Sequence, residues 1–279
     1  MQESDSNPNP MQEPSPNSNP NPNRVNQMKN IHVQALELFT HKEKSIEYYV
    51  SFYKNGAIKI LMQTGNKLER VIFTTKYGIN LLDKKGLKNI LFDLHIYAGL
   101  ALCIKKAYDT TKYTLNHITS FSQHKTMADS DSDSETEYNV QMSDELSRLT
   151  NKFENTESNY RDLFNGTKKF WQDAPKLNIL DMRTIIYQEK PYDMYTERKH
   201  EMEEIQNEGL DLFMKKNIDY GDAFAKYGIL GVVTRIEDKL QRLASITKNK
   251  ANLVIDETLN DTMMDLFNYT AMGLMLCEE

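Results

Sequence analysis

Apolar residues recur at helical spacing through the C-terminal half of the chain. From residue 146 onward their spacings are mostly three, four and seven, which predicts an amphipathic helix. These residues are Leu146, Leu149, Phe153, Tyr160 and Phe164. Pro175 and Pro191 bracket a short irregular stretch, and we expect a long helix from about Tyr195 to Lys216. Together with the helices expected nearer the C-terminus, the pattern predicts an all-α fold.

Two polar stretches divide the chain. Most of the prolines lie between Pro8 and Pro22, interleaved with Asn and Ser, and such a tract buries too little apolar surface to fold. An acidic, serine-rich run from Met127 to Glu137 is typical of a flexible linker. The expected divisions are a disordered tail at 1–28, a helical unit at 29–115, a linker at 116–140, connecting helices at 141–200 and a second helical unit at 201–279.

The two helical units resemble each other in sequence. Without a gap, 46–104 aligns with 218–276, and 35–39 aligns with 209–213 after a further shift of two positions. Matched pairs are Tyr48 with Tyr220, Phe52 with Phe224, Gly56 with Gly228, Lys67 with Lys239, Arg70 with Arg242, Asp93 with Asp265 and Tyr97 with Tyr269. A duplication explains these matches better than chance likeness between helices. We expect two related helical-bundle modules packed as an intrachain pseudo-dimer.

The two copies differ in their charged residues. Aligned apolar positions stay apolar, as in Leu87 with Leu259. Charged positions of the second copy change in the first: Asp222 to Val50, Arg235 to Gln63, Asp238 to Asn66, Glu257 to Lys85 and Asp261 to Asn89. Keeping a core while losing its carboxylates is expected of a copy that serves only as a scaffold. We therefore predict a degenerate first copy and an intact second copy.

Composition narrows the class of protein. The net charge of -6 gives no support for nucleic-acid binding. Two cysteines, Cys103 and Cys277, exclude a disulfide framework and a Cys-rich zinc site. No apolar run approaches the roughly 20 residues needed to span a bilayer, and the start of the chain lacks the features of a signal peptide. We expect a protein that is intracellular and cytoplasmic, without a membrane partner.

A first candidate cluster lies at the end of the expected long helix. It contains Lys215, Lys216, Asp219 and Tyr220 and is followed by Gly221, which would stop the helix or let backbone approach a ligand. The lysines could contact phosphate oxygens. The alternative is that the lysines bind no ligand and are placed there because positive charge is stabilising at the C-terminus of a helix.

A second cluster lies on the next predicted helix. Arg235, Lys239 and Arg242 are spaced by four and three, so they share one face, which Asp238 borders. Three cations on one stripe repel one another unless an anion neutralises them, and guanidinium groups bind phosphate well. The alternative is a salt-bridged surface stripe.

A third cluster consists of carboxylates on the last predicted helix. Glu257, Asp261 and Asp265 are spaced by four and drift by only about 40° per step. Stacked acids on a largely buried helix need a compensating cation, and Mg²⁺ prefers oxygen ligands. In the alternative, the acids pair with the cations of the second cluster and no metal is involved.

Together these clusters resemble a known family. K-x-x-D-Y-G from Lys216, R-x-x-D-K-x-x-R from Arg235 and E-x-x-x-D-x-x-x-D-x-x-N-Y from Glu257 resemble the nucleotide modification associated domain of phages and large DNA viruses. They are also similar to phage dATP/dGTP diphosphohydrolases, relatives of the MazG-like all-α pyrophosphohydrolases. The resemblance covers about 205–276, with a worn copy over 32–104. It implies a helical bundle, often of two protomers, that holds Mg²⁺ on helix carboxylates against a triphosphate.

The resemblance implies a role for each matched residue. Glu257, Asp261 and Asp265 would hold Mg²⁺, with Asp261 and Asp265 catalytic. The residues expected to contact the nucleotide are Lys216, Asp219, Tyr220, Arg235, Asp238, Lys239 and Arg242. The predicted function is Mg²⁺-dependent hydrolysis of a deoxynucleoside triphosphate to monophosphate and pyrophosphate. The alternatives are a nucleotide-binding protein without turnover and a structural interaction protein, and a homodimer through the helical modules is a further expectation.

Overall fold

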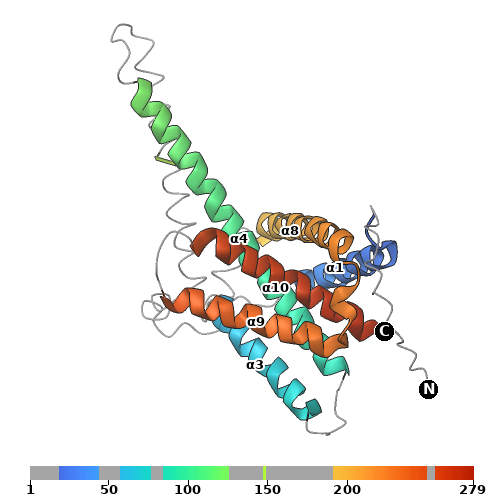
Figure 1. Ribbon diagram of the computed structural model, residues 1–279. Helices are drawn as coiled ribbons and strands as arrows, with labels where there is room; N and C mark the ends of the chain where they lie inside the picture. Colours follow the sequence, from blue (N-terminus) through green and yellow to red (C-terminus); the bar gives the residue numbers. More distant parts are fainter. Residues whose placement is uncertain (1–18, 44–56, 77–83, 126–146, 149–190, 250–254) are drawn as a thin grey trace, which may run out of the picture.

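The protein is helical throughout its described parts. The computed structural model describes residues 19–43, 57–76, 84–125, 147–148, 191–249 and 255–279, and Figure 1 shows its helices. The elements are α1 (Pro22–Glu43), α3 (Ala57–Lys76), α4 (Lys84–Lys125), α8 (Pro191–Tyr220), the short 3₁₀ helix η1 (Ala223–Ala225), α9 (Gly228–Asn249) and α10 (Ile255–Glu278). No strand occurs among these residues. The all-α prediction is confirmed.

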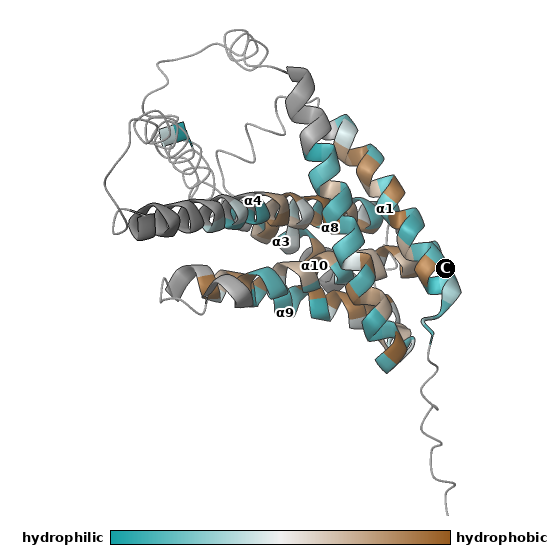
Figure 2. Ribbon diagram, turned by 90° about the horizontal axis from the view of Figure 1, so that it is seen from above, coloured by the Kyte–Doolittle hydropathy of each residue, from teal (hydrophilic) through white to brown (hydrophobic). Residues whose placement is uncertain are grey.

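Two helices, α4 and α10, form the centre of the bundle. Most side chains of α10 between Leu259 and Met275 are buried, as are most of those of α4 between Leu87 and Cys103. A helix that is apolar on most of its faces needs neighbours all around it. Helices α3 and α9 provide them on one side, and α1 and α8 on the other (Figure 1). Seen from above, α8 presents a largely hydrophilic surface while α10 is more hydrophobic (Figure 2).

Each helix of the first unit contacts the helix that the sequence repeat aligns with it. The contacting pairs are α1 with α8, α3 with α9 and α4 with α10. At the centre, Nδ1 of His95 lies 3.0 Å from the carbonyl oxygen of Phe267, a residue 172 positions away. Gln206 donates a hydrogen bond of 2.8 Å to the carbonyl of His32, 174 positions away. These separations equal the two offsets at which the sequence aligns with itself, so aligned positions lie against each other.

The element boundaries differ from the sequence prediction at three places. The predicted tail extended to residue 28, but α1 begins at Pro22 and buries Val25 and Met28 in the core. Proline is well tolerated at the start of a helix because that N–H needs no partner. The predicted linker began at 116, whereas α4 continues to Lys125. Helix α8 runs from Pro191 to Tyr220, beyond both ends of the expected span from about Tyr195 to Lys216.

Other parts of the prediction fall outside the described residues. They are the tail up to residue 18, the linker beyond 125 and most of the helix expected near 146–164. Among the described helices, none combines the length and apolar character that crossing a bilayer requires.

Candidate functional site

A cleft opens where α8 ends and α9 begins, beside α10. Its volume is about 410 Å³, within the size range of small-molecule sites. We call it the α8–α9 cleft. Its lining residues are Phe213, Lys216, Asn217, Tyr220, Gly221, Ala223, Phe224, Tyr227, Gly231, Val232, Arg235, Tyr269 and Met272.

Aromatic side chains dominate the cleft. Tyr220 is 70% exposed and Tyr227 is 75% exposed, although large apolar rings are usually covered. Phe224 is partly buried against the core, and its ring meets that of Phe213 edge-on at a centroid distance of 6.2 Å. The cleft therefore has aromatic side chains in its lining, two of which are largely exposed.

Three glycines shape the backbone around the cleft. Gly221 and Gly228 have φ angles of 54° and 61°, a conformation that other residues adopt only with strain. Gly221 ends α8 as the sequence predicted, and its N–H donates to the carbonyl of Asn217 at 2.8 Å. At Gly231, an added Cβ would lie 2.7 Å from Cβ of Tyr227. The missing side chain of Gly231 therefore lets Tyr227 pack against the first turn of α9.

Two cations line the cleft. Arg235 on α9 is 65% exposed in its side chain, and its Nη1 lies 3.5 Å from Asp238. That pair is weak because water screens two exposed charges. Lys216 on α8 donates a hydrogen bond of 2.8 Å to Oδ1 of Asp265. An anionic ligand in the cleft would therefore be close to two cations. The guanidinium of Arg235 is only weakly paired, and the ammonium of Lys216 is already bonded to the carboxylate of Asp265.

Asp265 on α10 binds two lysines at once. Lys239 donates to its Oδ2 at 2.8 Å, while Lys216 occupies Oδ1. Burial raises the pKa of Asp265, but the hydrogen bonds and charges of the two lysines outweigh it and hold the pKa below its ordinary value. Its carboxylate therefore stays ionised and neutralises Lys239, whose side chain is only 19% exposed.

The structure brings together part of the predicted set of site residues. Lys216, Tyr220 and Arg235 line the cleft, and Lys239 joins them through Asp265. The others do not line it: Asp219, Asp238, Arg242 and Asp261 are exposed on the surface, and the side chain of Glu257 lies outside the described residues. The three predicted cations therefore have different surroundings. Lys239 donates a hydrogen bond to the carboxylate of Asp265, whereas Arg235 and Arg242 are exposed.

The described donors do not fit a Mg²⁺ ion as they are arranged. Both oxygens of Asp265 accept hydrogen bonds from ammonium groups, so a metal would have to displace a lysine. Asp261 is exposed. Within the described ranges, no three His, Cys, Asp or Glu side chains form a group that could hold a metal. Magnesium therefore stays a prediction.

Sequence reasoning missed several residues of the cleft. The sequence pattern includes Phe224 and Tyr269 only as repeat matches, and it predicts no site role for Tyr227 or Asn217. One signal was present, because the dipeptide Tyr-Gly occurs at both Tyr220 and Tyr227. An aromatic residue next to a glycine at each end of a short loop is a pattern that predicts exposed rings beside a turn. Asn217 carries no comparable signal, although its side chain donates to the nearby Gly221 carbonyl and to Asp222 and accepts from the distant Asn21.

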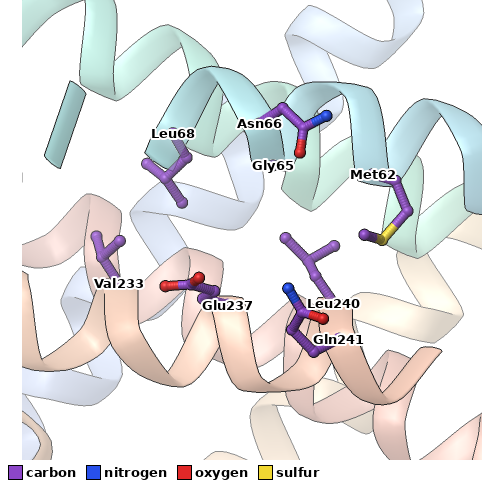
Figure 3. A pocket seen from close by; sticks show the side chains of 8 residues that line it. All are labelled: Met62, Gly65, Asn66, Leu68, Val233, Glu237, Leu240 and Gln241. Atoms are coloured by element: carbon purple, nitrogen blue, oxygen red, sulfur yellow. The ribbon is translucent and has the colours of Figure 1, made fainter. Parts of the chain in front are cut away.

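A second cavity lies between α3 and α9 and is too small for an organic ligand. Its volume is about 30 Å³, the scale of a single water molecule. Figure 3 shows its lining, with Leu240 of α9 projecting toward α3. An added Cβ at Gly65 would come within 2.5 Å of Cδ1 of Leu240. Gly65 therefore permits the close packing of α3 on α9.

The comparisons with known proteins concern the same part of the chain. Residues 216–276 match a family model described as nucleotide modification associated domain 1. This range contains the end of α8, η1, α9 and most of α10, with every residue that lines the cleft except Phe213. No curated protein and no solved structure matches the chain, so the resemblance to MazG-like enzymes stays a prediction. The C-terminal helices of this chain are thus similar to the nucleotide modification associated domain 1 family.

Proposed function

We propose that the α8–α9 cleft binds a nucleotide. One observation supports this most strongly: exposed aromatic rings and two cations line a single cleft of about 410 Å³, inside the range that matches the nucleotide-modification family. A nucleotide has the same two parts, a flat base and an anionic phosphate.

The aromatic residues suit the base. Tyr220 and Tyr227 keep most of their surface exposed, and Phe224 and Tyr269 add further aromatic lining. Stacking of a base on an aromatic side chain contributes about 1–3 kcal/mol and tolerates any base. The rings therefore account for affinity without selecting one base.

The cations suit the phosphate. Arg235 is weakly engaged by Asp238, and its planar guanidinium can donate two hydrogen bonds to one phosphate. Lys216 is shared with Asp265, so a phosphate would compete for it with that carboxylate. Asp265 would still be neutralised by Lys239, which lowers the cost of releasing Lys216.

We further propose that the two helical units pack as an intrachain pseudo-dimer. The pairing of α1 with α8, α3 with α9 and α4 with α10 supports it, because elements that lie close to a two-fold axis contact their own equivalents. The first unit carries Gln63 where the second has Arg235, so it would act as a scaffold. Assembly of two whole chains stays a prediction.

Hydrolysis of a nucleoside triphosphate with Mg²⁺ is a further candidate activity of the same site. Asp261 and Asp265 lie one turn apart on α10, and this spacing favours the predicted catalytic roles. The two lysines on Asp265 oppose them, since the carboxylate would have to be released first. Binding alone accounts for the observed contacts, and turnover stays a prediction.

Calorimetric titration of the full chain with deoxynucleoside mono- and triphosphates, with and without Mg²⁺, tests the proposal. We expect binding, and a loss of affinity of about tenfold in Tyr220→Ala. Tyr113→Ala is the control, because Tyr113 on α4 is similarly exposed, at 72%, but does not line the cleft. Equal affinity in wild type and Tyr220→Ala, or no binding at all, contradicts the proposal. Release of pyrophosphate with Mg²⁺ would add the hydrolytic activity.

A further inference from the structure

The first turn of α1 contacts the loop that carries the wall of the cleft. Nε of Arg24 lies 3.1 Å from Oδ2 of Asp222, a residue 198 positions away. The side-chain amide of Asn21 donates to the same oxygen at 3.2 Å. The backbone N–H of Asn21 donates to Oδ1 of Asn217 at 2.7 Å. Three hydrogen bonds therefore join the N-terminal helix to the end of α8 and the residues that follow it.

Arg24 is held firmly in this position. Its side chain is 13% exposed, and its guanidinium lies 5.3 Å from the centroid of the Phe224 ring. It also donates to Gln27 at 2.8 Å and pairs with Glu279 near the end of α10. Phe224 is one of the residues that line the cleft. Arg24 therefore supports the aromatic wall through a cation–π contact as well as through Asp222.

The loop from Gly221 to Gly228 has little support of its own. Its two ends have positive φ angles, and the short-range backbone hydrogen bonds inside it come from Ala225 and Lys226. Asp222 occupies the N-cap position of η1 but makes no capping hydrogen bond there. Its carboxylate instead accepts from Asn217 at 3.2 Å and from α1. Side chains outside the loop thus decide where the loop lies.

We propose that Arg24 and Asn21 are positioning residues for the α8–α9 cleft. They fix Asp222 and Phe224 and so place the loop that carries Tyr227 at the cleft. Asp222, which stands next to the K-x-x-D-Y-G motif, then has a structural rather than a chemical role. The part of this inference that concerns affinity rests on the proposed nucleotide binding, and the part that concerns the loop does not.

The sequence repeat preserves the arginine of this contact in both units and the acid in one. In the register that aligns α1 with α8, Arg24 corresponds to Arg198, so both helices carry the arginine. The carboxylate partner of the arginine is not repeated, because Asp222 corresponds to Val50 in the gapless alignment. A valine side chain cannot accept a hydrogen bond. The sequence therefore excludes an ion pair between Arg198 and position 50 that would be equivalent to the pair of Arg24 with Asp222.

Hydrogen exchange and titration of the full chain test the inference together. In Arg24→Gln and in Asp222→Asn we expect amide exchange in residues 221–228 to rise about tenfold, and nucleotide affinity to fall by a similar factor. Lys88→Gln is the matched control, because Lys88 forms an ion pair of 2.9 Å with Glu278 at the same end of α10 without contacting the loop. It should change neither quantity.

A double-mutant cycle separates a shared role from two independent ones. If Arg24 acts through Asp222, the double variant should lose little more affinity than either single variant. Additive losses overturn the part of the inference in which Arg24 acts through Asp222, and unchanged exchange in the loop overturns the whole inference. Absence of nucleotide binding in the wild type would overturn the proposed function instead, and the exchange measurement would still decide whether Arg24 positions the loop.

Discussion

The two helical units share a core and differ in what that core supports. Aligned pairs such as Leu102 with Leu274 are fully buried in both units. At the surface, Arg235 of the second unit lines the cleft, whereas the aligned Gln63 is exposed on α3. Packing constrains buried positions to apolar residues of similar volume, and exposed positions are free of this constraint. The two units thus keep similar buried residues while they differ at the exposed position that lines the cleft in the second unit.

The two units also differ in the aromatic residues that they place at the centre of the bundle. His95 of the first unit stacks on the aligned Phe267 of the second, with ring centroids 3.8 Å apart, and His32 lies beside both. Nε2 of each histidine is buried and has no hydrogen-bond partner among the described residues. Burial lowers the pKa of His32 to about 4. Burial and the neighbouring His32 lower the pKa of His95 to about 3, although its contact with the Phe267 carbonyl partly opposes the shift.

The largest expected effect is on the free energy of unfolding and comes from the buried leucines that the two units share. Leu102→Ala and Leu274→Ala should each lower the free energy of unfolding by about 3 kcal/mol, because each leaves a cavity in a close-packed core. Urea denaturation measures both. If the two units are equivalent as scaffolds, the two losses will agree within about 1 kcal/mol. A large loss confined to the second unit would show that the first contributes little to stability.

The histidines should make stability depend on pH. Their folded pKa values lie below that of an unfolded histidine, so the unfolded state binds protons first as pH falls below about 6.5. Their contribution to stability should be constant above that pH and fall toward the folded pKa values of about 4 and 3. At about pH 4.5 the loss is about 2.6 kcal/mol per histidine.

Replacing a histidine by the residue of the other unit tests this comparison. His95→Phe gives the first unit the side chain of Phe267, and the fall in unfolding free energy between about pH 7 and 4.5 should shrink by about half. His41→Phe is the control, because His41 is exposed, and it should leave the fall unchanged. An identical pH dependence in His95→Phe and wild type would mean that other groups cause the acid sensitivity.

Asp265 and the aligned Asp93 should differ in their effect on ligand binding. Asp265→Asn removes the charge that holds Lys216 and leaves the lysine free for phosphate. We expect nucleotide affinity to rise about threefold, while Asp93→Asn leaves it unchanged. Titration of both variants without Mg²⁺ measures this. A loss of affinity in Asp265→Asn would show that the carboxylate itself contacts the ligand.

The smallest expected effect comes from Gly231, which aligns with Lys59 in the first unit. In Gly231→Ala the new methyl would lie 2.7 Å from Cβ of Tyr227, so the tyrosine must move. We expect a loss of nucleotide affinity of about twofold to threefold, measured by the same titration. At Gly65 an added Cβ would lie 2.5 Å from Cδ1 of Leu240, a residue that does not line the cleft, so Gly65→Ala serves as the control. Equal losses of nucleotide affinity in both variants would mean that Tyr227 does not contribute to the binding site.

Much of the local structure could be predicted, and part of the site as well. The stop of α8 at Tyr220 follows from Gly221 alone, because a glycine in the left-handed region ends a helix. Lys216, Tyr220 and Arg235 were predicted to contact a ligand and do line the cleft. The start of α1 was placed too late, since a proline-rich run masked the apolar Val25 and Met28 that begin its buried face.

By itself the sequence determined the helical character and the end of α8 before Gly221, because spacing and backbone chemistry act between near neighbours along the chain. The alignment of the sequence with itself is likewise a property of the sequence alone. Only the tertiary structure decided the charge pairing. Asp265 binds Lys239 and Lys216, which lie 26 and 49 positions away, and Asp222 binds Arg24 across 198 positions. Periodicity shows which face of a helix a charge lies on, but the partner of that charge depends on distances that packing sets.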